Sequence, residues 1–287
     1  MRLKMYLEFI KIEHTLFALP FAYIGAFMAE RGIVSLKLLV LIFTAFTGLR
    51  TAAMTFNRII DRDIDAKNPR TSARHIPAGL ISLREAYFIA FIFLLIYFIS
   101  AAMINRTTLL LSPIPALTAY IYPYLKRYTC LSHYFLGINL AFAPLGGWIS
   151  ITDSADFLGN ELVPTILGLA IIFWVAGFDI IYALQDLEFD RKMGLHSIGA
   201  HFGLKTALWI SRLNHTAFLI LLFVAFNLYD AKLAVFSVPV IAILLLLEHV
   251  ILRKDYTEKK IQVAFFYINA LISSTLFLFL FADVLLL

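Results

Sequence analysis

Residues 36–65 read LKLLVLIFTAFTGLRTAAMTFNRIIDRDID, an apolar run that ends in an asparagine and three aspartates. About 20 consecutive apolar residues are enough for an α-helix to cross the hydrocarbon core of a bilayer. The run up to Ile60 meets this length, and its polar residues gather at the carboxyl end. The stretch therefore predicts a membrane-spanning helix over residues 36–60 with a polar site at its carboxyl end.

The composition of the whole chain also indicates a membrane protein. Of its 287 residues, 61% are hydrophobic and 15% are charged, whereas soluble domains average about 45–50% and 25%. A soluble chain of this length has too little interior to bury so much apolar surface. The composition excludes a soluble enzyme, a disordered protein and a nucleic-acid-binding protein, and it predicts the lipid bilayer as a partner. One cysteine, Cys130, excludes an intrachain disulfide.

Further apolar stretches follow along the chain, and they predict an all-α membrane protein with nine transmembrane helices. The nine stretches are 12–29, 36–60, 83–104, 107–125, 131–150, 162–188, 204–227, 232–252 and 262–286. Because the fourth contains Pro113, Pro115 and Pro123, we expect a kinked or broken span there. No linker or second domain is indicated, so residues 1–287 are predicted to form a single domain.

The distribution of basic residues predicts the orientation of these helices. With nine spans, 18 Lys and Arg residues fall on the side of the N-terminus and 4 on the other side. Positively charged loops stay in the cytoplasm. We therefore expect a multi-pass cell-membrane protein with a cytoplasmic N-terminus and an external C-terminus.

The second span ends in three polar residues that share one helix face. At 100° per residue, Asn57, Asp61 and Asp65 drift by only about 40° per step. Asp63 lies about 200° from Asp61 on the same helix and is expected to be solvated.

The sixth span repeats this arrangement. Asp179, Asp186 and Asp190 fall within about 20° of one line, and Tyr182 lies about 60° to one side. Glu188 points away from this line. Two separate spans therefore each carry acids at helical spacing.

Carboxylates at these positions predict a magnesium site. Each costs about 2.5–3.5 kcal/mol at the centre of a membrane helix. Oxygen ligands suit a hard cation, and Mg²⁺ binds through a few carboxylates together with substrate phosphate. Two Mg²⁺ ions and an organic diphosphate are the implied ligands, with metal ligands Asn57, Asp61, Asp65, Asp179, Asp186 and Asp190. The alternative is a set of interfacial acids that reach water or pair with loop arginines.

Both motifs and their flanking loops resemble the UbiA superfamily of intramembrane prenyltransferases. Residues 57–65 look like that family's NDxxDxxxD motif, and residues 179–190 look like its DxxYxxxDxxxD motif. Residues 67–79, KNPRTSARHIPAG, resemble the NPRT…RxLPxG loop. Residues 122–127, YPYLKR, resemble the basic loop after the fourth helix. The likeness covers essentially the whole chain and is nearest to the 4-hydroxybenzoate polyprenyltransferase branch. Arg58, where the family often has Asp, and His75 depart from the pattern.

The resemblance implies helices around a central cavity and Mg²⁺-dependent transfer of a polyprenyl group to an aromatic acceptor in quinone biosynthesis. The donor would be an allylic diphosphate such as geranylgeranyl diphosphate. The implied catalytic residues are Asp61, Asp65, Asp186, Asp190 and Tyr182. The residues expected to bind the diphosphate are Asn57, Arg62, Lys67, Arg70, Lys126 and Arg127.

The acceptor stays open at this point. Arg50 lies on nearly the same face as Asn57 and about 10 Å deeper, and an arginine within a span is a functional candidate. Lys11 and His14, at the start of the first span, are further candidates for holding an aromatic acid. Transfer to a glycerol phosphate lipid is the alternative reaction. A cation transporter is a more remote alternative. Transporters place ionisable residues near the bilayer midplane, whereas the acids here gather at helix ends on one side of the membrane.

Overall fold

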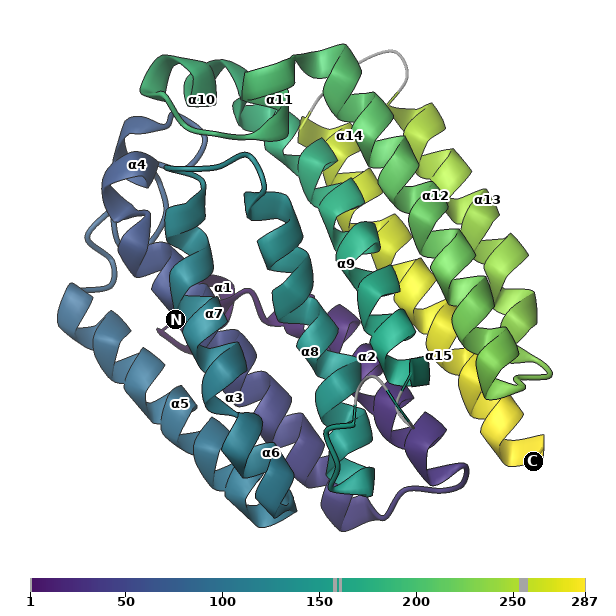
Figure 1. Ribbon diagram of the computed structural model, residues 1–287. Coiled ribbons are helices and arrows are strands. Elements are labelled where there is room, and N and C mark those ends of the chain that lie inside the picture. The colour runs from purple at the N-terminus through teal and green to yellow at the C-terminus, as the bar shows by residue number, and fades with distance from the viewer. Residues whose placement is uncertain (1, 157–158, 160–161, 253–257, 287) are drawn as a thin grey trace.

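The computed structural model describes residues 2–156, 159, 162–252 and 258–286 (Figure 1). The side chains of residues 3, 13, 14, 16, 17, 258 and 259 lie outside this description. All regular structure in the described residues is helical. The predicted all-α class is therefore confirmed.

The helices differ widely in length, and short ones separate several of the long ones. In chain order the elements are α1 (Arg2–Ile10), α2 (Ile12–Glu30), α3 (Leu36–Ile60), α4 (Arg62–Lys67), α5 (Leu83–Ile104), α6 (Arg106–Leu111), α7 (Pro113–Leu125), α8 (Ser132–Thr152), α9 (Leu162–Ala183), η1 (Leu184–Asp186), α10 (Leu187–Met193), α11 (Ile198–Phe202), α12 (Leu204–Tyr229), η2 (Ala234–Phe236), α13 (Ser237–Ile251), α14 (Glu258–Gln262), η3 (Val263–Ile268) and α15 (Asn269–Leu286). Of these, η3 is a π-helical turn, and η1 and η2 are 3₁₀ turns.

Seven helical segments in the described chain are long and apolar enough to cross a membrane. They include α3, whose bounds match the predicted 36–60. The other two predicted spans are shorter here: the apolar part of α2 is Ala18–Glu30, and 107–125 is divided between α6 and α7. The division falls before Pro113, the first residue of α7, because proline cannot continue a preceding helix but starts a new one well. The break expected from the prolines is confirmed, whereas the count of nine spans is not.

The sixth predicted span ends earlier than the sequence suggested. We predict a straight helix over 162–188, but α9 ends at Ala183 and the 3₁₀ turn η1 connects it to α10. The chain therefore bends between Asp179 and Asp190, so the straight-helix angles do not hold across this segment.

A core of large side chains lies around α9, which packs between α8 and α12. Trp174 of α9 is fully buried against Phe21, Phe178 and Phe218. In this core α2 packs against α8 and α15, so the first and last long helices are neighbours.

Two glycines allow α2 and α8 to approach closely. A Cβ at Gly25 would lie 1.9 Å from the carbonyl oxygen of Pro144, and a Cβ at Gly147 would lie 1.9 Å from that of Ala22. Membrane helices associate through such small residues because close backbone packing replaces the hydrophobic effect in lipid.

The functional elements gather at one end of the bundle. Figure 1 shows α4, α10 and α11 at the same end, where α3 and α9 terminate. Towards the middle of the bundle lies an apolar cavity of about 430 Å³, which is lined by residues of α2, α3, α5–α9 and η3.

Candidate active site

Asp61 lies in the break between α3 and α4 and is 2% exposed. Its carboxylate accepts hydrogen bonds from Asn57 Nδ2 at 3.2 Å, Lys126 Nζ at 2.6 Å and Arg127 Nη2 at 3.3 Å. Burial raises the pKa of the Asp61 carboxyl, whereas the charges of Lys126 and Arg127 act in the opposite direction. The predicted proximity of Asn57 to Asp61, one helical turn apart, is confirmed.

Asp65 is also buried but has a different cationic partner. Nη1 of Arg74 lies 2.8 Å from both carboxylate oxygens of Asp65. The hydroxyl of Thr71 donates to the Asp65 backbone carbonyl at 3.1 Å. The loop after α4 therefore folds back onto the helix that carries Asp65.

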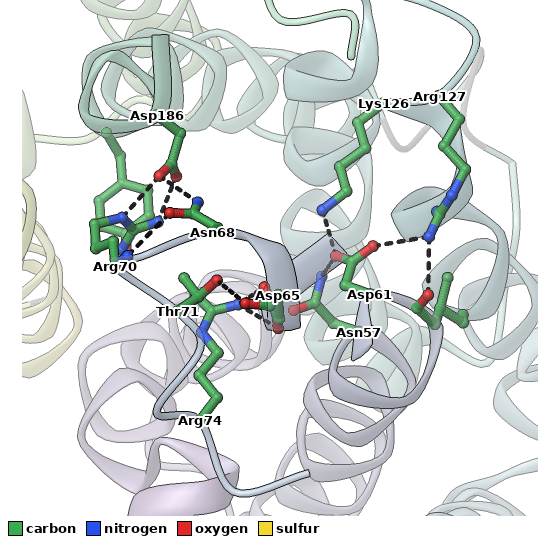
Figure 2. A network of polar contacts seen from close by, with 12 residues as sticks. Asn57, Asp61, Asp65, Asn68, Arg70, Thr71, Arg74, Lys126, Arg127 and Asp186 are labelled. Atoms are coloured by element: carbon green, nitrogen blue, oxygen red, sulfur yellow. Dashed lines mark hydrogen bonds and ion pairs between the residues drawn. The ribbon is translucent and has the colours of Figure 1, made fainter. Parts of the chain in front are cut away.

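The same loop joins the two acidic motifs, as Figure 2 shows. Asn68 Nδ2 donates to Asp186 Oδ1 at 2.8 Å, and Arg70 Nε donates to the same oxygen at 2.9 Å. Nη2 of Arg70 donates to Asp186 Oδ2, so the arginine holds the carboxylate in a two-pronged contact. Such a bidentate pair fixes the orientation of the Asp186 carboxylate and neutralises its charge. It also brings the two motifs into one site.

Tyr182 belongs to this junction. Its hydroxyl accepts a hydrogen bond from Arg70 Nη1 at 3.3 Å, and its ring faces the guanidinium at 5.5 Å. The ring also packs against Phe265, with 4.4 Å between centroids. Phe265 belongs to the π-helical turn η3, whose carbonyls at Ala264 and Phe265 accept from Asn269 Nδ2. Turns of this kind often occur at functional sites.

Asp179 is held by a histidine that the sequence did not single out. His133 Nδ1 lies 2.7 Å from Asp179 Oδ2, and the backbone N–H of Ile198 donates to His133 Nε2 at 3.3 Å. Because Nε2 accepts a hydrogen bond, the ring proton is on Nδ1 and is donated to Asp179. The imidazole is 3% exposed and connects α8, α9 and α11.

The remaining predicted residues at this end differ in their placement. Asp190 lies in α10, close to the side chain of Ser197. Arg62 pairs with the exposed Asp63 at 3.3 Å, and Lys67 is exposed. The structure thus brings Arg70, Lys126 and Arg127 to the acids but not Arg62 or Lys67. The exposure predicted for Asp63 is confirmed, and Glu188 is exposed too.

Sequence reasoning missed three residues of the site: Asn68, Arg74 and His133. Asn68 and Arg74 belong to the quoted loop 67–79, but helical spacing gives no information about side chains in a loop. His133 is one histidine at the start of an apolar stretch, and no local pattern distinguishes it. Its role becomes visible only through Asp179, 46 residues further along the chain.

The donor chemistry of the site fits Mg²⁺. The acids and Asn57 offer only hard oxygen ligands. Among the described residues, no three histidine, cysteine or acidic side chains lie close enough together to hold a metal ion by themselves. Mg²⁺ needs only one or two carboxylates from a protein when substrate phosphate supplies the other oxygen ligands.

The acceptor candidates lie in different places. Arg50 lines the apolar cavity together with Tyr122. Lys11 connects α1 to α2 in a left-handed conformation, with φ of 53°, and does not line the cavity. His14 is part of α2, but its side chain lies outside the described residues.

The cavity meets the acidic site at the end marked by Arg50 and Tyr122. Asn57 lies two helical turns beyond Arg50 on α3, and Lys126 lies one turn beyond Tyr122 at the end of α7. Phe265 also lines the cavity and contacts Tyr182. One end of the apolar cavity therefore lies next to the strongly polar site.

Comparisons with known proteins agree with this arrangement. A model of the UbiA prenyltransferase family matches residues 18–271. A polyprenyl transferase of Arthrobotrys oligospora is 38% identical over 154 residues, which are 53% of this chain and 41% of that protein. A 4-hydroxybenzoate octaprenyltransferase of Francisella tularensis subsp. novicida is 29% identical over 195 residues, 68% of this chain and 67% of that protein. The chain thus spans about two fifths to two thirds of these relatives.

Two solved structures share the fold over nearly the whole chain. A UbiA homologue from Aeropyrum pernix K1 has a TM-score of 0.85 and 36% identity, covering 96% of this chain and 98% of that one. A UbiA homologue from Archaeoglobus fulgidus, bound to DMAPP and Mg²⁺, has a TM-score of 0.74 and 26% identity, covering 98% of this chain and 99% of that one.

Proposed function

Since this chain belongs to the UbiA prenyltransferase family, we propose that it transfers a polyprenyl group from an allylic diphosphate to an aromatic acid within the membrane, as in quinone biosynthesis. The family predicted from the two motifs is confirmed. The observation that carries the proposal is the contact of Asn68 and Arg70 with Asp186, which joins both acidic motifs near one end of an apolar cavity.

The acids of the site would hold Mg²⁺ together with the diphosphate. The ligands we propose are Asn57, Asp61, Asp65, Asp179, Asp186 and Asp190, with two ions between them. Bound Mg²⁺ supplies Lewis-acid stabilisation of the charge that develops on the leaving diphosphate. The homologue bound to DMAPP and Mg²⁺ supports the use of Mg²⁺ with a prenyl diphosphate.

The basic residues bind the diphosphate in this proposal. Arg70, Lys126 and Arg127 already lie within hydrogen-bond distance of the acids, so their charged groups are available at the same place for phosphate oxygens. Lys67 is exposed and Arg62 is partly exposed at the same end, and both would reach the diphosphate through their long side chains. The fixed guanidinium fork of Arg70 matches phosphate geometry best.

The cavity would hold the prenyl tail and keep water away from the reacting carbon. An allylic cation is quenched by water, so its transfer needs a dry chamber with electron-rich faces. Tyr182 and Phe265, which pack together between the acids and the cavity, provide such faces.

Arg50 is the residue that favours an acidic acceptor. Arg50 lines the cavity, and none of the described acids makes an ion pair with it. An arginine facing an intramembrane cavity attracts an anionic group, and a carboxylate fits its planar fork. A 4-hydroxybenzoate-like acid placed there would have its ring near the end of the diphosphate site. Lys11 and His14 are secondary candidates for the same group.

We infer that α2 and the α6–α7 pair also cross the membrane, which gives nine spans in a single domain over residues 1–287. The distribution of basic residues supports a cytoplasmic N-terminus, a site open to the cytoplasm and an external C-terminus.

The test is an acceptor screen with purified protein in detergent. Geranylgeranyl diphosphate and Mg²⁺ are supplied with either 4-hydroxybenzoate or a glycerol phosphate lipid, and products and released diphosphate are measured. We expect prenylated 4-hydroxybenzoate, reduced in Arg50→Leu through a raised KM for the acid. Product from the glycerol phosphate lipid alone would reject the aromatic acceptor. No metal-dependent release of diphosphate would reject the enzyme and leave the transporter alternative.

A further inference from the structure

The apolar cavity extends far from the acidic end, along most of α8. Cavity-lining residues of α8 run from Leu136 to Ile149. The acidic end of α8 is marked by His133, which contacts Asp179. Gly146 lies 13 residues further along, which corresponds to a rise of about 20 Å. A tail that reaches Gly146 must therefore contain several isoprene units.

Two adjacent glycines, Gly146 and Gly147, lie in this deep part of the cavity wall, and they differ in their surroundings. A Cβ at Gly147 would lie 1.9 Å from the carbonyl oxygen of Ala22, so this glycine is required by the contact between α8 and α2. A Cβ at Gly146 would have no neighbour within 4 Å. Helix packing does not explain why position 146 lacks a side chain.

The space beside Gly146 belongs to the cavity. Gly146 lines it together with Ile104, Thr108 and Ile149, which lie at the ends of α5, α6 and α8 that are farthest from the acids. Glycine in the interior of a helix costs about 1 kcal/mol relative to alanine. A side chain at this position would project into the volume that the tail must fill.

We propose that Gly146 is a specificity-determining residue that gives the deep end of the cavity room for a long prenyl tail. This inference rests on the proposed function and deepens it, because it assigns the length class of the donor: an allylic diphosphate whose tail has several isoprene units. The single unit of dimethylallyl diphosphate is too short to reach Gly146.

The experiment compares a short and a long donor in the wild type and in Gly146→Leu. Diphosphate release from dimethylallyl diphosphate and from geranylgeranyl diphosphate is measured with Mg²⁺ and 4-hydroxybenzoate. One methylene in an apolar pocket changes kcat/KM by about 10-fold or more. We therefore expect the ratio of kcat/KM for the long donor to that for the short donor to fall at least about tenfold in Gly146→Leu.

A second variant and a matched control keep this result interpretable. Gly146→Ala adds one methyl group into open space, so it should also lower the ratio of kcat/KM for the long donor to that for the short donor, by a smaller factor than Gly146→Leu does. Gly25→Ala, at a position that does not line the cavity, should lower the melting temperature, because its Cβ collides with the Pro144 carbonyl of α8, while the ratio keeps its wild-type value. An unchanged ratio in both Gly146 variants, or an equal fall in Gly25→Ala, would overturn the inference. A wild type that releases diphosphate from neither donor would instead count against the proposed function.

Discussion

The two acidic motifs place their central aspartates in the same kind of backbone but hold them with different partners. Asp61 lies between α3 and α4 with φ of −90° and ψ of 0°, and Asp186 is the last residue of η1, directly before α10, with φ of −104° and ψ of 9°. This sparsely populated region of backbone conformation is common in active sites. Both carboxylates are thus positioned where a helix bends, and no straight helix carries either one.

The difference lies in where the partners come from. Asp61 is held by Asn57 of its own motif and by Lys126 and Arg127 after α7. Asp186 is held by Asn68 and Arg70, which both follow the first motif. The loop after the first motif therefore holds the central aspartate of the second motif, so Asp186 depends on the first motif. Substitutions in the two motifs and their partners should therefore differ in how much activity they remove.

The largest loss of activity is expected from substitution of the central aspartate of either motif. Asp61→Asn and Asp186→Asn should each lower kcat by at least about 10³-fold, because stabilisation of the leaving diphosphate is worth several kcal/mol. Turnover of geranylgeranyl diphosphate is measured in protein whose melting temperature confirms folding. Substantial activity in either variant would remove that aspartate from the metal site.

Arg70 tests the dependence of the second motif on the first. Arg70→Lys keeps the charge but loses the two-pronged contact with Asp186, so kcat/KM should fall by about 10²-fold. With the diphosphate held less firmly, a larger share of the donor should be hydrolysed to free prenyl alcohol, measured by chromatography. Arg191→Gln is the matched control, because Arg191 lies at the same end but donates to the Ala200 carbonyl. Equal losses in both variants would contradict a special role for Arg70.

Local patterns could predict the parts of the site that depend on helical spacing. The bounds of α3, the contact of Asn57 with Asp61 and the exposure of Asp63 all follow from periodicity along one helix. The break before Pro113 follows from the geometry of proline. These features need only residues within a few turns of each other.

Contacts between distant segments could not be predicted in this way. Arg70 and Asp186 are 116 residues apart, and His133 and Asp179 are 46 residues apart. The residues of 67–79 form turns whose side-chain directions have no fixed period. The bend at Ala183 also replaces the straight helix assumed from the spacing of the acids, because a 3₁₀ turn has fewer residues per turn.

His133 tests the other aspartate of the second motif, because it is the hydrogen-bond partner of Asp179. Losing a hydrogen bond to a charged group costs about 1.5–3 kcal/mol, so His133→Leu should lower kcat about tenfold or more. His133→Asn keeps a donor at the place of Nδ1 for Asp179, whereas His133→Gln keeps an acceptor at the place of Nε2 for Ile198.

If His133 acts by positioning Asp179, kcat should be rescued by Asn and not by Gln, with similar melting temperatures for both variants. Rescue by Gln alone would assign the histidine to anchoring α11. Equal activity in all three variants would make it a packing residue.

The smallest effects are expected at the acids that both motifs leave in solvent. Asp63 and Glu188 are exposed, and the carboxylate of Asp63 accepts a hydrogen bond from the neighbouring Arg62. Substitutions at such surface positions usually change stability by no more than about 0.5 kcal/mol. Asp63→Ala and Glu188→Ala should therefore keep kcat within about twofold of the wild type, whereas Asp65→Ala, which removes the partner of Arg74, should lose orders of magnitude. The measurement is the steady-state turnover of the three variants, compared with that of the wild type. A loss in Asp63→Ala as large as that in Asp65→Ala would mean that α4 rotates when substrate binds, because the backbone described here turns only Asp65 towards the loop that carries Arg70 and Arg74.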